Sequence, residues 1–247
     1  MNTLKIAILQ PSYLPWLGFF DQMAHADTFV FLDDIQYTRR DWRNRNRIRT
    51  KDNWAWLTVP VIQKDKFHQP LLETRIDNSV NWRHKHLQSI HHNYSRSPYF
   101  NLYFPYFESL YNKQWTYLVD LCYETIYYLC EKLNIHTPTL KSSELNAGGL
   151  KDEKILAICR KLNASHYLTG DKAKDYLSAE VFLEQNIVLE YHEYMHPEYS
   201  QQFPCFVPYL SVIDVLFNLG EKSGEILIQK RMNAGDLAPY PNGRLQV

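Results

Sequence analysis

Residues 4–34 read LKIAILQPSYLPWLGFFDQMAHADTFVFLDD, and this stretch decides the fold class. Residues 4–9 are a short apolar run that predicts a buried strand, which Pro11 ends because proline lacks a backbone donor. Residues 19–26 have the pattern of a short amphipathic helix, and residues 28–32 predict a second strand rich in β-branched and aromatic side chains. Strand, helix and strand in such close succession form a βαβ unit, so we expect the two strands to be parallel.

The rest of the chain alternates between short strands and helices. Strands are predicted at residues 54–61, 71–76, 165–169 and 187–191, and helices at 81–93, 99–113, 115–134, 152–162, 212–219 and 224–231. We therefore expect one α/β domain over residues 1–232, with a mostly parallel, Rossmann-like sheet and a helical insertion near residues 80–140. Residues 233–247 are expected to form a mobile tail.

The composition limits the classes of function. The 247 residues carry 27 basic and 27 acidic side chains, and this neutral balance argues against a general nucleic-acid binder. The four cysteines form no Cys-x-x-Cys pair, which indicates buried thiols in a reducing compartment. No stretch reaches the roughly eighteen apolar residues of a membrane span, so we expect a cytoplasmic protein without membrane insertion. The 18 Tyr, 12 Phe and 6 Trp suit a pocket for a sugar or nucleobase, or a heavily aromatic core.

Residues 10–18, QPSYLPWLG, follow the first predicted strand. In open parallel sheets, ligands bind beyond the carboxyl ends of the strands, so this turn is a candidate ligand site. It lacks the Gly-x-Gly-x-x-Gly fingerprint of dinucleotide-binding folds, and it is not a P-loop. Nucleotidyltransferase-like folds carry a His-x-Gly-His turn at this place, and the absence of histidine here argues against that adenylyl-transfer chemistry. The alternative is a rigid turn that closes the sheet.

Residues 38–51, TRRDWRNRNRIRTK, hold the strongest physical signal in the chain. Four arginines alternate with other residues, so an extended segment would project all four to one face: Arg43, Arg45, Arg47 and Arg49. Adjacent guanidiniums repel one another unless an anion neutralises them, and arginine clamps phosphate or carboxylate through paired hydrogen bonds. We therefore predict an anion site. The alternative is a solvated charged loop, or an edge strand protected by its charge.

Two further groups could carry acid–base chemistry. Asp33 and Asp34 end the second strand, where carboxylates can bind a metal, hold a ribose, act as a base or pair with the arginines. Four histidines cluster in residues 81–94, NWRHKHLQSIHHNY, but they lack the His-Glu-x-x-His spacing of a zinc site, so no metal site is predicted. His86 is the better candidate for a single acid–base histidine.

Polar and aromatic residues gather again near the end of the chain. His196, Tyr199 and Gln202 lie in a loop after the last predicted strand. Ser211 opens a helix, where it suits an N-cap or, alternatively, a helix N-terminus that faces an anion, and Asp214 lies in the same first turn. The chain has no Gly-x-Ser-x-Gly motif, so serine hydrolase chemistry has no support.

Several blocks of the sequence resemble one family. Residues 6–48 (IAILQPSYLP through NRNRI) and WLTVPV look like the opening of a WbqC-like protein, and NWRHKHLQSIHHNY, ASHYLTGDKAKDYL, HPEYSQQF and PYLSVIDVLFNLG look like its later blocks. The resemblance runs from about residue 4 to residue 220. The positions that match its motifs are Gln10, Pro11, Tyr13, Pro15, Gly18, Asp33, Gln36, Asn44, Arg45, Trp82, His86, Tyr94, Gly170, Tyr176, His196, Tyr199, Gln202, Ser211 and Asp214.

The resemblance implies a cytoplasmic enzyme of bacterial surface-polysaccharide synthesis, as in O-antigen pathways. Its expected reaction is the acylation or aminoacylation of the amino group of a nucleotide-linked sugar. The arginines would hold the diphosphate of this anionic substrate, Tyr13 and Trp16 would stack on a ring, and His86 or Asp33 would take the proton from the amine. The resemblance names no cofactor.

The candidate residues follow from both lines of reasoning. The candidate catalytic residues are His86, Asp33 and His196. The candidate substrate-binding residues are Gln10, Tyr13, Trp16, Gly18, Gln36, Arg43, Asn44, Arg45, Arg47, Gly170, Tyr176, Tyr199, Gln202, Ser211 and Asp214. Two alternatives stay open: a non-catalytic binding or scaffold protein of the same pathway, and an ATP-dependent ligase with a nucleotidyltransferase-like core. Nucleic acid is expected only as an aminoacyl-tRNA donor, and a homo-oligomer is compatible with the sequence.

Overall fold

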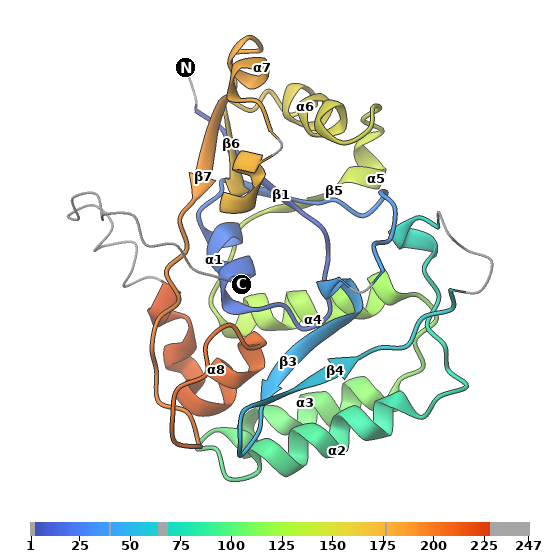
Figure 1. Ribbon diagram of the computed structural model, residues 1–247, viewed down its shortest axis with the longest axis vertical. Helices are drawn as coiled ribbons and strands as arrows, with labels where there is room; N and C mark the ends of the chain where they lie inside the picture. Colours follow the sequence, from blue (N-terminus) through green and yellow to red (C-terminus); the bar gives the residue numbers. More distant parts are fainter. Residues whose placement is uncertain (1–2, 40, 64–68, 176, 228–247) are drawn as a thin grey trace.

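The centre of the molecule is a sheet of five parallel strands. The computed structural model describes residues 3–39, 41–63, 69–175 and 177–227. The strands of the sheet are β1 (Lys5–Leu9), β2 (Thr28–Phe31), β5 (Thr139–Lys141), β6 (His166–Gly170) and β7 (Val188–His192). They lie in the order β5-β2-β1-β6-β7 (Figure 1), which matches the first five positions of the Rossmann order 3-2-1-4-5-6. The predicted α/β class with a parallel, Rossmann-like sheet is confirmed.

Side chains of the central strand β1 point alternately to two separate cores. Ile6 and Ile8 pack on one side of the sheet, whereas Ala7 and Leu9 contact the core on the other side. The first core is completed by α6 (Asp152–Lys161) and α7 (Ala179–Leu183), and the second by α1 (Leu17–Ala24) and α4 (Leu118–Lys132). Helices therefore cover both faces, which is the usual condition of a parallel sheet.

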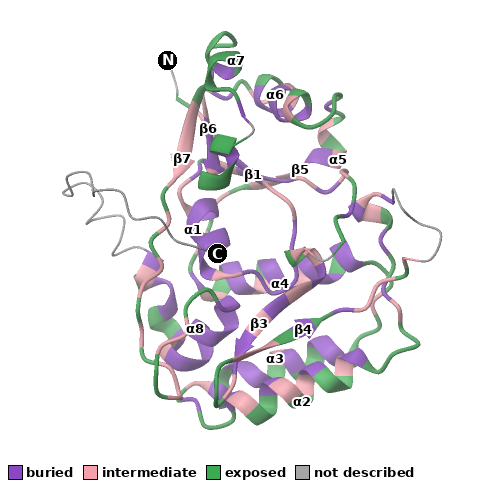
Figure 2. Ribbon diagram, in the orientation of Figure 1, coloured by how far each residue is buried: buried purple, intermediate pink, exposed green. Residues whose placement is uncertain are grey.

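The second core continues away from the sheet into a helical part of the molecule. This part contains α2 (Trp82–Tyr94), α3 (Phe100–Asn112), α8 (Val212–Leu219) and the antiparallel hairpin of β3 (Arg45–Arg49) and β4 (Trp54–Thr58). In Figure 1 these elements lie beyond α1 and α4, opposite α6 and α7. Figure 2 shows α1 and α8 almost wholly buried, whereas α2 has an exposed face. The extent of the domain, residues 1–232, stays a prediction.

The prediction of a strand at residues 71–76 is wrong. Leu71–Glu73 forms a 3₁₀ helix, and Ile76 makes only an isolated bridge. Pro70 precedes the turn with its φ fixed at −62°, and the Thr74 hydroxyl donates to the Pro70 carbonyl at 3.0 Å. This local hydrogen bond competes with the extended conformation that the apolar residues alone favour.

The short elements β5, α5 (Ser142–Leu145) and α7 are among those that the sequence does not predict. The predicted helix at residues 224–231 is described as far as residue 227 and is helical from residue 225. The predicted tail, residues 233–247, lies outside the described residues. Within the described ranges, no helix has both the length and the apolar character needed to cross a membrane.

Gly18 leaves room for the indole of Trp16 at the start of α1. A Cβ atom at residue 18 would lie 2.3 Å from Cη2 of Trp16. The indole has little freedom to move because it packs edge-on against Tyr194, with ring centroids 4.9 Å apart, and against Tyr209 at 5.7 Å. The glycine is therefore a packing requirement of the turn that follows β1.

We expect Gly18→Ala to destabilise the protein by about 1–3 kcal/mol, because the added methyl group overpacks a filled site. Gly148→Ala is the matched control, since no heavy atom lies within 4 Å of a Cβ placed there. Urea denaturation followed by circular dichroism measures both free energies of unfolding. Equal stability of the two variants would contradict the packing argument.

Candidate functional site

The β3–β4 hairpin presents alternate arginines on one face. Arg45, Arg47 and Arg49 pair directly with Thr58, Trp56 and Trp54 of β4, and residues that are directly opposite in an antiparallel pair share a face. The prediction of a one-sided arginine row is therefore confirmed for these three. It is wrong for Arg43, which lies in the 3₁₀ helix η1 (Trp42–Asn44) before the strand begins.

Three indoles surround the guanidiniums of Arg45 and Arg47. The Arg45 guanidinium lies 4.4 Å from the ring centroid of Trp56. The Arg47 guanidinium lies 5.2, 5.0 and 6.0 Å from the centroids of Trp42, Trp54 and Trp56. Trp42 and Trp56 are 39% and 37% exposed, so the surface is open to solvent. We call these five residues the Arg–Trp face, and its chemistry combines cation–π contacts with stacking surface.

Arg47 is the cation on this face whose surroundings are best defined. Its Nη2 donates to the Tyr209 carbonyl at 3.1 Å, while its Nε is buried and has no hydrogen-bond partner. Partial burial lowers the pKa of Arg47. No described carboxylate forms an ion pair with Arg47, so its charge is compensated by rings and a carbonyl only. A desolvated guanidinium in such a place favours an anionic ligand.

Arg43 lies at the carboxyl end of β1. Its Nη1 donates to the Gln10 carbonyl at 3.2 Å and to the Ser12 hydroxyl at 2.9 Å, and its Nε pairs with Asp41 at 3.4 Å. The Gln10 side-chain oxygen is buried without a hydrogen-bond partner. In the 3-2-1-4-5 order, the direction of the strand order reverses between β1 and β6, and this is where ligands of open α/β sheets bind.

An aromatic chain links Trp16 to the loop after β7. Trp16 contacts Tyr194 and Tyr209, and the His196 ring lies 5.0 Å from the Tyr209 ring. The His196 Nδ1 lies 2.8 Å from the Pro197 carbonyl. An open pocket of about 420 Å³ in this loop is lined by Glu198, Tyr199, Ser200, Gln201, Phe203, Cys205 and Phe206. His196 therefore belongs to the loop whose Tyr209 carbonyl binds Arg47.

The buried carboxylate of Asp214 in α8 accepts hydrogen bonds from three side chains, one in α2 and two in the loop after β7. It accepts hydrogen bonds from Tyr94 of α2 at 2.8 Å, and from Tyr199 at 2.8 Å and Gln201 at 2.9 Å in the loop. Burial raises the pKa of Asp214 to about 6, and the three hydrogen bonds act in the opposite direction. Asp214 is fully buried, so it lies in a position to hold the loop rather than to meet a ligand.

Tyr13 and His86 form part of a buried hydrogen-bonded chain. His86 Nε2 donates to the Thr58 carbonyl at 3.2 Å, and Nδ1 accepts from the Tyr13 hydroxyl at 2.9 Å, which in turn bonds to Tyr111. Burial lowers the pKa of His86 to about 4, so the ring is neutral near pH 7. Both ring nitrogens are engaged and Tyr13 is fully buried. The expectations that Tyr13 stacks on a ligand and that His86 takes a proton from one therefore conflict with this packing.

Asp33 is also occupied within the fold. The backbone N–H of Ser143 donates to Asp33 Oδ1 at 3.0 Å, and the Ser143 hydroxyl donates to Oδ2 at 2.9 Å. Ser142 donates to Oδ1 at 3.1 Å and Tyr123 to Oδ2 at 2.7 Å. This fully buried carboxylate joins the end of β2 to the start of α5. Neighbouring Asp34 pairs with Lys154 at 2.6 Å, and with none of the arginines that the structure describes.

The other candidate residues have mostly internal partners. Asn44 donates to the Val59 carbonyl, Gln202 to the Asn93 carbonyl, and the Ser211 hydroxyl accepts from the backbone of Ile213 as the N-cap of α8. Gln36 is exposed and forms a bridge with Pro70, and Gly170 ends β6 with open space around it. Tyr176 lies outside the described residues. The structure thus brings Trp16, Arg45, Arg47 and His196 into one connected region and uses most of the others as internal support.

Comparison with known proteins agrees with the sequence blocks quoted above. A model of the WbqC-like protein family matches residues 10–226. The chain belongs to the WbqC-like protein family. It is 36% identical over 225 residues to the uncharacterized protein Rv1507c of Mycobacterium tuberculosis, which covers 90% of this chain and 97% of that protein. No solved structure shows a significant match.

One side-chain cluster of this WbqC-like protein is absent from the residues that the sequence singles out. Asp21, His25 and His192 bring their possible ligand atoms within 4.8 Å of one another. The four-residue separation of Asp21 and His25 on a predicted helix is a signal that could have been used. His192 could not have been added, because its approach to α1 depends on the order of the strands.

The raised pKa of Asp214 predicts a specific pH dependence of stability. An aspartate pKa near 4 in the unfolded chain and about 6 in the folded one means that folding takes up a proton between these values. The stability that the protonated group contributes is complete below pH 4 and is lost as the pH rises through 6. Relative to Asp214→Asn, the wild-type protein should lose about 2–3 kcal/mol between pH 4 and pH 7.

Urea denaturation of both proteins across this pH range measures the difference. Glu184→Gln is the control, because Glu184 is exposed and its replacement should leave the pH dependence of the wild-type protein unchanged. A constant difference between the wild-type protein and Asp214→Asn at all pH values would show that the buried carboxyl is not titrating in this window.

Proposed function

We propose that this protein binds a nucleotide-linked amino sugar through its diphosphate and transfers an acyl or aminoacyl group to the sugar amine. The single observation that supports anion binding in this proposal is the environment of Arg47. Its half-buried guanidinium has three indoles and a carbonyl around it, a buried Nε without a partner and no described carboxylate in an ion pair. Charge-assisted hydrogen bonds to a phosphate would satisfy this group.

The surroundings of Arg47 suit the rest of such a ligand. Exposed Trp42 and Trp56 offer flat apolar surfaces for a base or a sugar ring. Arg45 lies two residues along the same strand face, so two guanidiniums could contact the two phosphates of a diphosphate. The location of the protein, any homo-oligomer and the use of an aminoacyl-tRNA as donor stay predictions.

The proposed transfer is a nucleophilic acyl substitution. The amine nitrogen of the sugar attacks the carbonyl carbon of the donor, a new C–N bond forms, and the bond from that carbon to the donor's sulfur or oxygen breaks. The proton lost by the amine needs a base. Among the three candidate catalytic residues, His86 and Asp33 have their acceptor atoms engaged inside the fold. We assign the base to His196 for its position alone: its Nδ1 is bonded to the Pro197 carbonyl, and its ring lies 5.0 Å from the ring of Tyr209, whose carbonyl accepts from Arg47.

The occupied state of His86 and Asp33 also favours a second candidate function. A protein of the same pathway that binds the nucleotide sugar without turning it over would need the Arg–Trp face and no base. The two functions share the binding site and differ in chemistry. A test of binding and a test of turnover therefore separate them.

Replacing Arg47 should abolish most of the binding. A thermal-shift screen of UDP-, dTDP- and GDP-linked amino sugars identifies a ligand, and calorimetry then measures its affinity. Arg47→Ala should weaken binding at least about tenfold, because a charge-assisted hydrogen bond is worth roughly 1.5–3 kcal/mol. Arg47→Lys keeps the charge but loses the planar fork, so its affinity should lie in between.

Arg160→Ala is the control, because Arg160 is an exposed residue of α6. Unchanged affinity in Arg47→Ala would remove the anion clamp from the proposal.

Replacing His196 should affect turnover and leave binding intact. With a nucleotide amino sugar and a coenzyme A ester or aminoacyl-tRNA, we expect His196→Ala to lower the rate of amide formation by about 10²–10⁴-fold. Calorimetry on the same variant should give the wild-type affinity for the sugar nucleotide. Binding without product from any donor would support the non-catalytic function, and full activity of His196→Ala would refute the role of this residue.

A further inference from the structure

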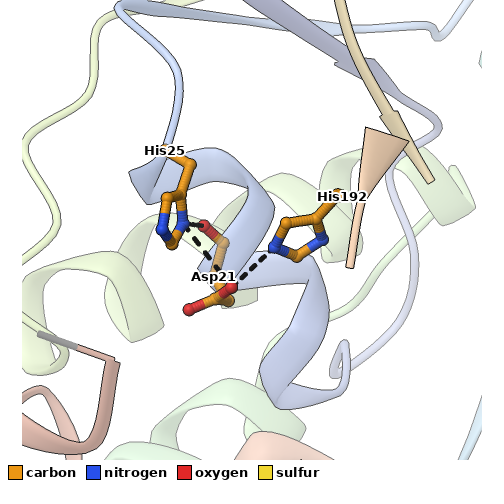
Figure 3. Close-up of side chains that lie close together, drawn as sticks. All are labelled: Asp21, His25 and His192. Carbon is orange, nitrogen blue, oxygen red and sulfur yellow. Dashed lines mark hydrogen bonds and ion pairs between the residues drawn. The ribbon is translucent and has the colours of Figure 1, made fainter. Parts of the chain in front are cut away.

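Two histidines and one aspartate converge between α1 and β7, and none of the three belongs to the Arg–Trp face. Asp21 and His25 are four residues apart on α1, so they lie on the same face of the helix. His192 is the last residue of β7 and reaches this face from the sheet. Figure 3 shows the two imidazoles on either side of the Asp21 carboxylate.

The distances are close to those of a metal-binding triad. Asp21 Oδ2 lies 2.6 Å from His192 Nε2 and 3.5 Å from His25 Nδ1, and the three ligand atoms fall within 4.8 Å of one another. Ions such as Zn²⁺ bind nitrogen and oxygen at about 2.0–2.2 Å, which places neighbouring ligand atoms roughly 3–3.5 Å apart. Small side-chain rotations therefore suffice to place all three around one ion. The His25 Nδ1, now 2.7 Å from the Asp21 carbonyl, would exchange that contact for the metal.

Burial and charge also suit a cation at this place. The Asp21 side chain is only 7% exposed and that of His192 is 10% exposed, whereas the His25 side chain is 34% exposed. In the described part of the chain, the ion pairs of Asp21 go to these two histidines and to no lysine or arginine. A buried carboxylate needs hydrogen bonds or a positive partner, and a bound ion would supply the positive charge at Asp21. The exposed edge of His25 leaves a path from solvent.

We propose that Asp21, His25 and His192 bind one divalent transition-metal ion. Two imidazole nitrogens and one carboxylate oxygen select ions such as Zn²⁺, Fe²⁺ or Co²⁺ over Mg²⁺ and Ca²⁺, which prefer oxygen ligands. Three protein ligands leave coordination positions for water or another small molecule. The site shares no residue with the Arg–Trp face, so a test of metal binding does not depend on the proposed sugar-nucleotide transfer.

The site can be tested with the metal alone. Protein without an affinity tag, treated with a chelator and dialysed, is titrated with Zn²⁺ in a calorimeter, and Co²⁺ is added to a second sample to record its visible absorption. We expect one ion per chain and a Co²⁺ spectrum typical of nitrogen and oxygen ligands. His25→Ala and His192→Ala should each weaken Zn²⁺ binding at least tenfold. His92→Ala is the control, since His92 is exposed on α2, and it should bind as the wild-type protein does.

The outcomes separate cleanly. Asp21→Asn keeps the size of the side chain and should also lose the ion; if that variant does not fold, partly exposed His25 still allows a test in a folded protein. Absence of stoichiometric Zn²⁺ binding in the wild-type protein would overturn the proposal. So would Zn²⁺ binding that His25→Ala and His192→Ala leave unchanged, because the ion would then lie elsewhere.

Discussion

The β3–β4 hairpin is held against the rest of the molecule by two buried charges of opposite sign, Asp214 and Arg49. Arg49 is 1% exposed, although it lies on the same strand face as Arg45 and Arg47. Its guanidinium donates to four carbonyls, two of them in the loop at Pro204 and Cys205. Its backbone N–H donates to the Tyr94 hydroxyl, which donates to Asp214. A buried arginine and a buried aspartate would each be costly alone, and the shared network offsets both.

The elements that pack on the hairpin give the arginines of β3 and η1 different surroundings. The loop around Pro204 covers the end of β3 and takes Arg49 into the interior, where it bonds to carbonyls. The Arg47 guanidinium donates to the Tyr209 carbonyl near the end of this loop, and the Arg47 carbonyl accepts from the Ser211 N–H. Arg43 lies before the strand and turns toward the end of β1. Four arginines with the same spacing thus have three different environments, and the difference comes from the elements that pack on the hairpin.

The sequence predicts the parts of the fold that depend on local pattern. The βαβ unit, the long helices and the cap at Ser211 follow from apolar spacing and side-chain chemistry. The three-residue strand β5 could not be predicted, because so short a segment has no period to recognise. The Asp21–His192 contact joins residues 171 positions apart, and only the strand order brings them together. Local pattern also leaves open which polar side chains the fold uses internally.

That last limit explains why matching a family motif does not by itself locate the chemistry. Asp33, His86 and Asp214 are residue types that suit catalysis, and all three match the motifs. Each is buried with its polar atoms engaged, His86 between Tyr13 and Thr58, and Asp33 at the start of α5. Their hydrogen bonds connect segments distant in sequence, so selection for the fold alone would retain them. The Arg–Trp face and the Asp21 cluster differ because part of each still faces solvent: Trp42 and Trp56 are exposed, and the His25 side chain is 34% exposed. Chemistry with an external ligand requires side chains that the ligand can reach, and these two places supply them.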